Sequence, residues 1–465
     1  MKHFSVIYFL IIFALILVAS AHAAPNKDRV LDIQNLTTDN GIEVWLVEDH
    51  SVPIVSVSFS MPGGLSADPL DKAGLSNLLS AMMDEGAGEY DAQAFQQILS
   101  ENSIALHFNA GRDYFSGSFQ TLTRTLDTAI ELTNLSLTQL RFDDDALTRM
   151  KQAIESEIKH NIKRPGWIAA RSFNGLMFEG DAYGLPGKGT LSSLAAMTQE
   201  DLHNQSQLQF NTEGMKIAIA GDVTAQQAKL IASELTKGMP NKRNFKLPKK
   251  KAKFRNTGKT FLYEYDAPQT HIVIGHEGIP VSDEDWPAVQ IINYVFGGGG
   301  FDSRLMEEIR EKRGLTYGVG SYLSNLKRTA TIQASLSTSN KNTAEALDIL
   351  KKEWVRMATT GPTDKEIQNA KDYLTGSLLL NLTSTDSIAN NLNGLQKYGF
   401  DHDYINRRNQ RIMDVTADQA RVVAGRLLNS DELMVIMVGP HLNDGAQTGA
   451  DITQLDKIPG MGQTQ

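Results

Sequence analysis

Residues 297–317 read GGGGFDSRLMEEIREKRGLTY, a glycine run followed by a charged segment and a second glycine. The glycine run consists of Gly297, Gly298, Gly299 and Gly300. Because glycine has no Cβ, such a run lets the backbone turn and approach another segment closely. Apolar residues at the spacing of one helix face predict a helix over residues 303–312, and Gly314 is expected to end it. Arg310 then lies in the last helical turn, and Tyr317 lies early on the strand that follows.

The composition is that of an ordinary globular protein large enough for more than one domain. Apolar residues make up 41% and charged residues 21% of the 465 residues, so the chain can bury a large core without disulfides or metals. The formal net charge of −9 argues against non-specific binding of nucleic acid. The absence of cysteine excludes disulfides, thiolate catalysis and cysteine-ligated zinc.

The first 23 residues have the pattern of a secretory signal peptide. Lys2 belongs to a short basic region, an apolar run spans residues 6–19, and a cleavage-type A-x-A sequence ends at Ala23. Cleavage is expected after Ala23, with Ala21 as a second option. An uncleaved anchor is the alternative, but the run is shorter than the roughly 20 residues that span a bilayer. No other apolar stretch is long enough, so we expect no stable membrane span after cleavage. Export without disulfides favours a bacterial periplasm.

The remaining chain contains an internal repeat of about 200 residues. Strand and helix patterns over residues 30–240 recur in the same order over residues 260–441, and each set predicts a sheet with helices packed on it. The predicted fold class is α+β, with two similar sheet-plus-helix domains. Residues 241–259 hold nine Lys or Arg and are predicted to be a solvated linker, with a polybasic membrane patch as the alternative. The polar tail, residues 442–465, is predicted to be flexible.

Three segments resemble pitrilysin/insulinase-type zinc peptidases: residues 39–44, residues 73–82 and, most specifically, residues 297–317. The resemblance extends over about residues 30–440 and implies an α/β roll in each half, related by a pseudo-two-fold repeat. It also implies that Arg310 and Tyr317 reach across a chamber, whose backbone includes the glycine run, to hold an extended peptide substrate. The alternative is a solvated basic helix end beside a half-buried strand tyrosine.

The resemblance includes the helix that carries the zinc motif, but the ligands are missing. Active relatives have H-x-x-E-H, in which two His bind zinc and the Glu is the general base. The three places here hold Asn77, Ser80 and Ala81, and none of these side chains can perform those tasks. Glu157 lies 76 residues after Ala81, at the place of the third ligand. We therefore expect no zinc in this chain. Glu157 and His160 would offer only two ligands, and an ion pair is the more common use of such a pair.

These features favour a non-catalytic, substrate-binding subunit of a heteromeric zinc peptidase. A zinc-bearing subunit of the same family would form a heterodimer with this chain and supply the zinc, the base and the water. Arg310 and Tyr317 would contact the peptide backbone, and the chain alone is expected to hydrolyse no peptide. The alternative is a scaffold protein derived from the same family with no role in proteolysis. A third hypothesis is an active peptidase with an unrecognised metal site.

Overall fold

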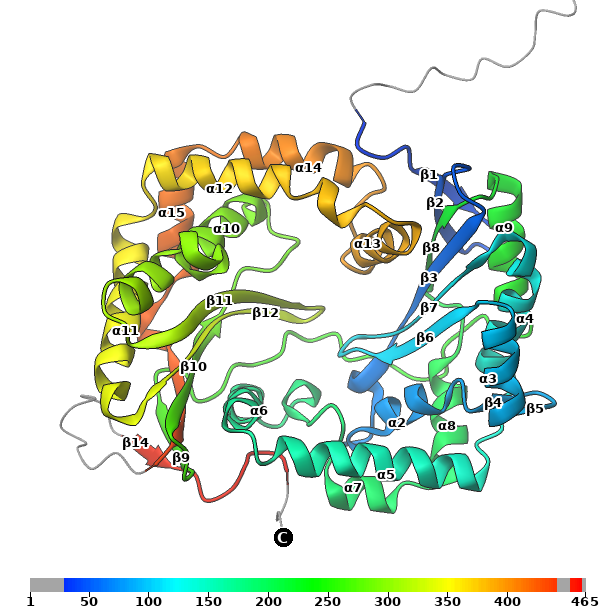
Figure 1. The fold of residues 1–465 in the computed structure, drawn as a ribbon, viewed down its shortest axis with the longest axis horizontal. Helices are drawn as coiled ribbons and strands as arrows, with labels where there is room; N and C mark the ends of the chain where they lie inside the picture. The colour runs from blue at the N-terminus through cyan, green and yellow to red at the C-terminus, as the bar shows by residue number, and fades with distance from the viewer. Residues whose placement is uncertain (1–28, 441–451, 462–465) are drawn as a thin grey trace, which may run out of the picture.

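The computed structural model describes residues 29–440 and 452–461, and the predicted signal peptide lies outside them. Two six-stranded sheets form the framework of the protein, one in each half of the chain (Figure 1). The first sheet contains β1 (Gln34–Thr37), β2 (Glu43–Glu48), β3 (Ile54–Pro62), β6 (Ala105–Ala110), β7 (Tyr114–Leu122) and β8 (Lys216–Gly221). The second sheet contains β9 (Thr260–Glu264), β10 (Gln269–Glu277), β11 (Thr316–Leu326), β12 (Thr329–Ser339), β13 (Met434–Gly439) and β14 (Ile452–Gln454).

Five strands have the same order in the two sheets, which reflects the internal repeat, and a sixth strand is added at one edge of each: β1, antiparallel to β2, and β14, parallel to β9. The order is β1-β2-β8-β3-β7-β6 in the first sheet and β14-β9-β13-β10-β12-β11 in the second. In the first sheet β2 pairs in parallel with β8, and at the corresponding place in the second sheet β9 pairs in parallel with β13. From β8 and β13 onward the pairs are antiparallel: β8-β3-β7-β6 in the first sheet and β13-β10-β12-β11 in the second. This confirms the predicted α+β fold with two similar sheet-plus-helix domains.

Helices pack around both sheets, on the outer side and also on the side that faces the other half of the chain (Figure 1). Those of the first half are α2 (Leu75–Met82), α3 (Ala92–Glu101), α4 (Leu126–Thr138), α5 (Asp144–Asn161), α6 (Pro165–Met177), α7 (Leu191–Ala196), α8 (Gln199–Gln209) and α9 (Ala225–Leu235). Those of the second half are α10 (Trp286–Asn293), α11 (Thr343–Thr360), α12 (Asp364–Gly376), α13 (Thr385–Lys397), α14 (Tyr404–Met413) and α15 (Ala417–Leu427). Across the described ranges, every helix is too short or too polar to cross a membrane.

Both faces of the first sheet are buried, as β2 illustrates. Successive side chains of a strand point to opposite faces. Val44 and Leu46 belong to the large apolar cluster of the first half. Trp45 and Val47 belong to a different cluster, whose other members include Leu392 of α13. The second face of this sheet is therefore covered by a helix from the other half of the chain.

The two halves exchange one helix each. Helix α13 packs on β3 and β8 of the first sheet, where Asn393 donates a hydrogen bond to the carbonyl oxygen of Lys216 at 3.1 Å. Helix α6 of the first half packs on β10 and β13 of the second sheet. Its Phe173 shares an apolar cluster with Val273 and Ile436 of those strands. Each sheet needs the other half to bury its second face, so the halves are not independent packing units.

The basic segment, residues 241–259, joins the halves and forms neither helix nor strand at any of its positions, all of which are described. Its middle is fixed rather than freely solvated. Ala252 is buried, and its amide donates to the carbonyl oxygen of Arg328 at 3.2 Å. The amide of Arg255 donates to the carbonyl oxygen of Met177 at 2.9 Å. The segment therefore contacts both halves along its course.

The prediction of a flexible tail is wrong for residues 452–461. Strand β14 pairs in parallel with β9 and occupies the place that β1 has in the first sheet. Ile458 and Met461 are buried, at 2% and 3% exposure. The second domain therefore extends beyond the predicted end at residue 441, because a few apolar side chains attach this mostly polar segment to the core. The rest of the predicted tail lies outside the described residues.

Candidate functional site

A π-helical segment, Tyr294–Gly298, continues α10, and the first two glycines of the run are its last two residues. A Cβ on Gly297 would lie 2.5 Å from the backbone nitrogen of Ser321, so this position must be glycine for the run to pack against β11. At Gly300 an added Cβ would meet no atom within 4 Å, but the φ of +59° is a left-handed conformation that favours glycine. The buried end of the run thus contacts the chain's own sheet, while Gly298 and Gly300 are exposed.

The charged segment after the run also adopts π-helical geometry, over Met306–Glu311. The amide of Lys312 donates to the carbonyl oxygen of Glu307 at 2.9 Å, and the amide of Gly314 donates to that of Arg310 at 2.8 Å. Gly314 has a φ of +64°, which confirms that it ends the helix. The predicted α-helix over residues 303–312 is therefore π-helical for most of its length. Single π turns occur frequently at functional sites.

Arg310 and Tyr317 both present their side chains at the surface near the start of β11. The guanidinium carbon of Arg310 lies 4.4 Å from the ring centroid of Phe301, which is itself 63% exposed. Tyr317 is 85% exposed, on an edge strand and at the irregularity between Thr316 and Val319. Within residues 29–440 and 452–461, neither side chain forms a hydrogen bond or ion pair. Both polar groups are therefore available to an incoming ligand.

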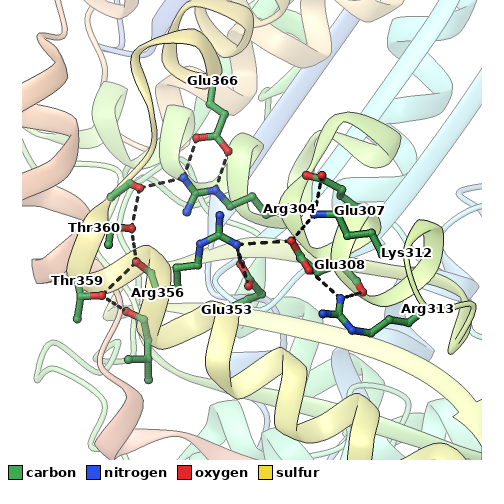
Figure 2. Close-up of polar contacts among 12 residues, drawn as sticks. Arg304, Glu307, Glu308, Lys312, Arg313, Glu353, Arg356, Thr359, Thr360 and Glu366 are labelled. Carbon is green, nitrogen blue, oxygen red and sulfur yellow. Dashed lines mark hydrogen bonds and ion pairs between the residues drawn. The ribbon is translucent and has the colours of Figure 1, made fainter.

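A network of ion pairs holds the π-helical segment in place (Figure 2). The buried guanidinium of Arg304 binds the carboxylate of Glu366 through two nitrogens, at 2.6 and 2.7 Å, and donates to the carbonyl oxygen of Gly361 at 3.0 Å. On the same segment, Glu308 accepts hydrogen bonds from Lys312 and from Arg313, both at 2.7 Å. Arg304 and Glu308 precede Arg310 in the sequence, and Lys312 and Arg313 follow it, so this network fixes the backbone on both sides of Arg310.

The same contacts change the acidity of both carboxyl groups. Hydrogen bonds from Lys312 and Arg313 lower the pKa of Glu308 to about 2, against an opposing effect of burial. Burial alone would raise the pKa of Glu366, but hydrogen bonds from Arg304 and Thr363 outweigh it and lower the pKa to about 2. Both groups are therefore ionised at neutral pH and act as fixed anions inside the network.

The degenerate motif positions lie on helices, as expected, but do not form a metal site. Asn77, Ser80 and Ala81 are on α2, where the Ser80 hydroxyl donates to the backbone carbonyl of Asn77 at 2.8 Å. Glu157 is an exposed residue of α5 that forms an ion pair with Lys188. Among the residues described, no group of three or more His, Asp or Glu side chains could hold a metal ion. The donor atoms present at the motif positions do not fit zinc, which prefers imidazole, thiolate and carboxylate ligands.

The purified chain is expected to contain far less than one zinc per molecule, because the ligand positions hold amide, hydroxyl and methyl groups. Elemental analysis after dialysis against a weak chelator measures this directly. The triple variant Asn77→His, Ser80→Glu, Ala81→His restores the H-x-x-E-H pattern and is the matched comparison. Tight stoichiometric zinc in the unaltered chain would contradict the prediction.

The role of Phe301 is not predictable from the sequence. It precedes Arg310 by nine residues, which matches no α-helical or strand repeat. The pairing of Arg304 with Glu366 likewise joins residues 62 positions apart. In the structure Thr363 and Glu366 form a capping box at the start of α12, and the Thr-x-x-Glu spacing of this box is a local sequence signal that does not indicate Arg304 as the partner.

Comparisons with known proteins agree with this arrangement. The family profile described as "Insulinase (Peptidase family M16)" matches residues 43–186, and "Peptidase M16 inactive domain" matches residues 196–374. Among relatives, the "Uncharacterized zinc protease YmxG" of Bacillus subtilis is 23% identical over 76% of this chain and 86% of its own length. The "Non-peptidase homolog YmxG" of Helicobacter pylori is 25% identical over 77% of this chain and 82% of its own length.

Two solved structures illustrate the similarity in three dimensions. The peptidase M16 inactive domain from Pseudomonas fluorescens superposes with a TM-score of 0.84 at 25% identity, covering 89% of this chain and 98% of that one. The periplasmic protease PqqL from Escherichia coli has a TM-score of 0.75 at 17% identity. The alignment covers 89% of this chain but 46% of PqqL, so this chain spans about half of that protein.

Proposed function

This chain belongs to peptidase family M16, the insulinase family, as a non-catalytic member, and from that premise we propose that it is the substrate-binding subunit of a heteromeric zinc peptidase. The observation that carries the proposal is the contrast between two places in the fold. The motif helix has neither the metal ligands nor the general base of the active motif, whereas half-buried Arg310 and exposed Tyr317 keep side-chain donors that no described residue uses.

The role proposed for these two residues is to hold the backbone of an extended peptide. The Arg310 guanidinium is a planar group with several N–H donors, and the ring of Phe301 restricts its position from one side. The Tyr317 hydroxyl donates a further hydrogen bond to a peptide carbonyl. Donors fixed in this way act where negative charge develops on that carbonyl during hydrolysis. A zinc-bearing subunit of the same family would bind this chain as a heterodimer and supply the zinc, the general base and the attacking water.

The proposal places the heterodimer in the periplasm. Its basis is the signal-peptide pattern of residues 1–23 together with the absence of cysteine from the chain. The similar structure PqqL is a periplasmic protease, and this location agrees with the proposed compartment.

Purification of the tagged chain from its native host tests the proposal. The expected result is a co-purifying protein that contains H-x-x-E-H, with peptidase activity in the mixture and none in this chain alone. A co-purifying partner without such a motif, and a mixture that cleaves no peptide, would instead indicate a scaffold protein.

A further inference from the structure

The two halves meet where the tips of two hairpins touch. The turn between β6 and β7 carries Asp113, and the turn between β11 and β12 carries Lys327. The Asp113 carboxylate accepts a hydrogen bond from the Tyr183 hydroxyl at 2.5 Å and another from the amide of Lys327 at 2.8 Å. Figure 1 shows the free end of the β11–β12 hairpin reaching across the centre of the molecule towards the first sheet. Both halves therefore contribute to the surfaces around this contact.

Two neighbouring cavities, of about 240 and 820 Å³, open beside the hairpin contact and are called here the seam cavities. They share five lining residues: Tyr114, Leu326, Lys327, Lys397 and Tyr398. Seven cationic side chains line them, namely Arg112, Lys216, Lys249, Lys251, Lys327, Arg328 and Lys397. Only Asp113 and Glu277 are anionic. This excess of positive charge is local, because the whole chain has a formal net charge of −9.

The carboxylates of the protein neutralise only part of this charge. Three of the seven cations form ion pairs: Lys216 with Glu43, Lys251 with Glu277 and Arg328 with Asp181. In the described part of the chain, the other four form none: Arg112, Lys249, Lys327 and Lys397. Asp113 is engaged by the two hydrogen bonds at the hairpin contact.

Lys327 and Lys397 are the central pair of these unpaired cations, because both line both cavities. The ammonium nitrogen of Lys327 lies 5.3 Å from the ring centroid of Tyr114, and the side chain of Lys397 is half-buried. Burial lowers the pKa of Lys397, and it also lowers the pKa of Lys327 although the nearby Asp113 carboxylate opposes the change. Lys397 bears this desolvation cost with no ion pair in the described structure, and Lys327 has near it only the Asp113 carboxylate, which already accepts two hydrogen bonds. A ligand that brings negative charge would stabilise both ammonium groups.

We propose that the seam cavities bind acidic side chains of the substrate, so that the preferred peptides carry Asp or Glu. This inference rests on the proposed peptide-binding function and names its substrate class. Tyr114 and Tyr398 supply apolar ring surface for the methylene groups of such side chains, while the lysines supply charge. Lys397 is half-buried and Lys327 is exposed in the unbound chain, so a bound peptide would exclude water from both ammonium groups and strengthen their attraction to a carboxylate.

The fold also predicts where the acidic residues lie in the peptide. Tyr317 is at the start of β11 and Leu326 is at its end, nine residues further on. A strand rises about 3.3 Å per residue, so the seam cavities lie about 30 Å along the strand from Tyr317. An extended peptide whose backbone contacts Tyr317 therefore reaches the seam cavities with residues about nine positions away.

The test compares two fluorescent 20-residue peptides that are identical except at three neighbouring positions. These positions lie about nine residues from the peptide residue that is expected to contact Tyr317. One peptide has Glu at these positions and the other has Gln. Binding of each to the purified full-length chain is measured by anisotropy at two salt concentrations. The Glu peptide is expected to bind at least about tenfold more tightly at low salt and to lose this advantage at high salt.

The variant Lys327→Gln/Lys397→Gln should remove that preference while leaving the Gln peptide unaffected. The control is Lys159→Gln/Lys352→Gln, which removes the same charge from two exposed helix lysines paired with Glu155 and Asp348. Equal melting temperatures show that all variants fold.

If both peptides bind equally, or the lysine variant keeps the preference, the acidic-substrate inference is wrong while the proposed function stands. If neither peptide binds, the proposed function fails as well. Tighter, lysine-dependent binding of single-stranded DNA would replace the inference with a nucleic-acid site.

Discussion

Replacing Arg310 with Ala, or Tyr317 with Phe, is expected to lower the turnover of the reconstituted peptidase by about 10²–10³-fold. Removal of one fixed donor from the developing oxyanion typically has an effect of this size. The melting temperature should barely change, because Tyr317 is 85% exposed and its hydroxyl has no partner within the described structure. Loss of the contact between Arg310 and Phe301 should cost less than about 1 kcal/mol, since the ring is exposed. The measurement is peptidase rate beside melting temperature and yield of the complex.

Matched controls separate this effect from a general loss of surface groups. Arg124 is an exposed arginine of the first half with no ion pair to any described residue, and Tyr90 lies on the short strand Tyr90–Asp91 far along the chain from β11. Arg124→Ala and Tyr90→Phe should leave the rate unchanged. If Arg310→Ala and Tyr317→Phe also melt normally, bind the partner and leave the rate unchanged, the two residues are ordinary surface groups. The scaffold hypothesis would then replace the substrate-binding one.

The repeat and the site positions could be predicted because they depend on local patterns. Alternation of apolar residues indicates strands such as β3 and β10, and the order of elements in the two halves was readable from the sequence. Gly314 was predicted to end the charged helix, and its φ of +64° confirms this. Because Gly314 ends the helix, Arg310 lies in its last turn and Tyr317 lies on the strand that follows.

The exchange of α6 and α13 between the halves could not be predicted. Their apolar residues indicate that each helix buries one face, but periodicity does not say which sheet covers that face. The π geometry at Met306–Glu311 was also unpredictable, because about ten residues of apolar spacing do not distinguish i+4 from i+5 hydrogen bonding. In the tail, composition predicted flexibility for residues 452–461, whereas a few apolar side chains and the free edge of β9 determine the outcome.

At the metal-motif positions, too, the sequence predicted the helices but not the contacts that individual side chains make. Asn77 and Glu157 lie on the helices predicted from their neighbours. The partner of Glu157 is Lys188, 31 residues later in a loop, and no sequence spacing links the two. The functional roles of Arg310, Tyr317 and the glycine run stay predictions, since their placement at the surface is compatible with substrate binding without testing it.

Replacing Glu366 with Gln is expected to destabilise the protein by about 3–5 kcal/mol, the usual cost of removing one partner of a buried ion pair. The guanidinium of Arg304 is 5% exposed and would keep its charge without a counter-ion. The folded-state pKa of Glu366, about 2, lies below that of an unfolded Glu near 4.3. Its contribution is therefore complete above about pH 4.5 and is lost as the pH falls towards 2. Urea unfolding at several pH values measures both effects.

The loss in stability on acidification should accordingly be smaller in Glu366→Gln than in the unaltered chain, while Glu308, whose pKa is also about 2, keeps its own share in both proteins. Glu345→Gln, at an exposed position in the first turn of α11, is the control: it removes a charge that interacts with the helix dipole and should cost less than about 1 kcal/mol, well below the effect of Glu366→Gln. The double variant Arg304→Met/Glu366→Gln removes the buried charge and should recover much of the lost stability. Equal destabilisation by the double and single variants would contradict the ion-pair explanation. Because Arg304 anchors the segment that carries Arg310, the single variant should also reduce the activity of the reconstituted peptidase at temperatures where it remains folded.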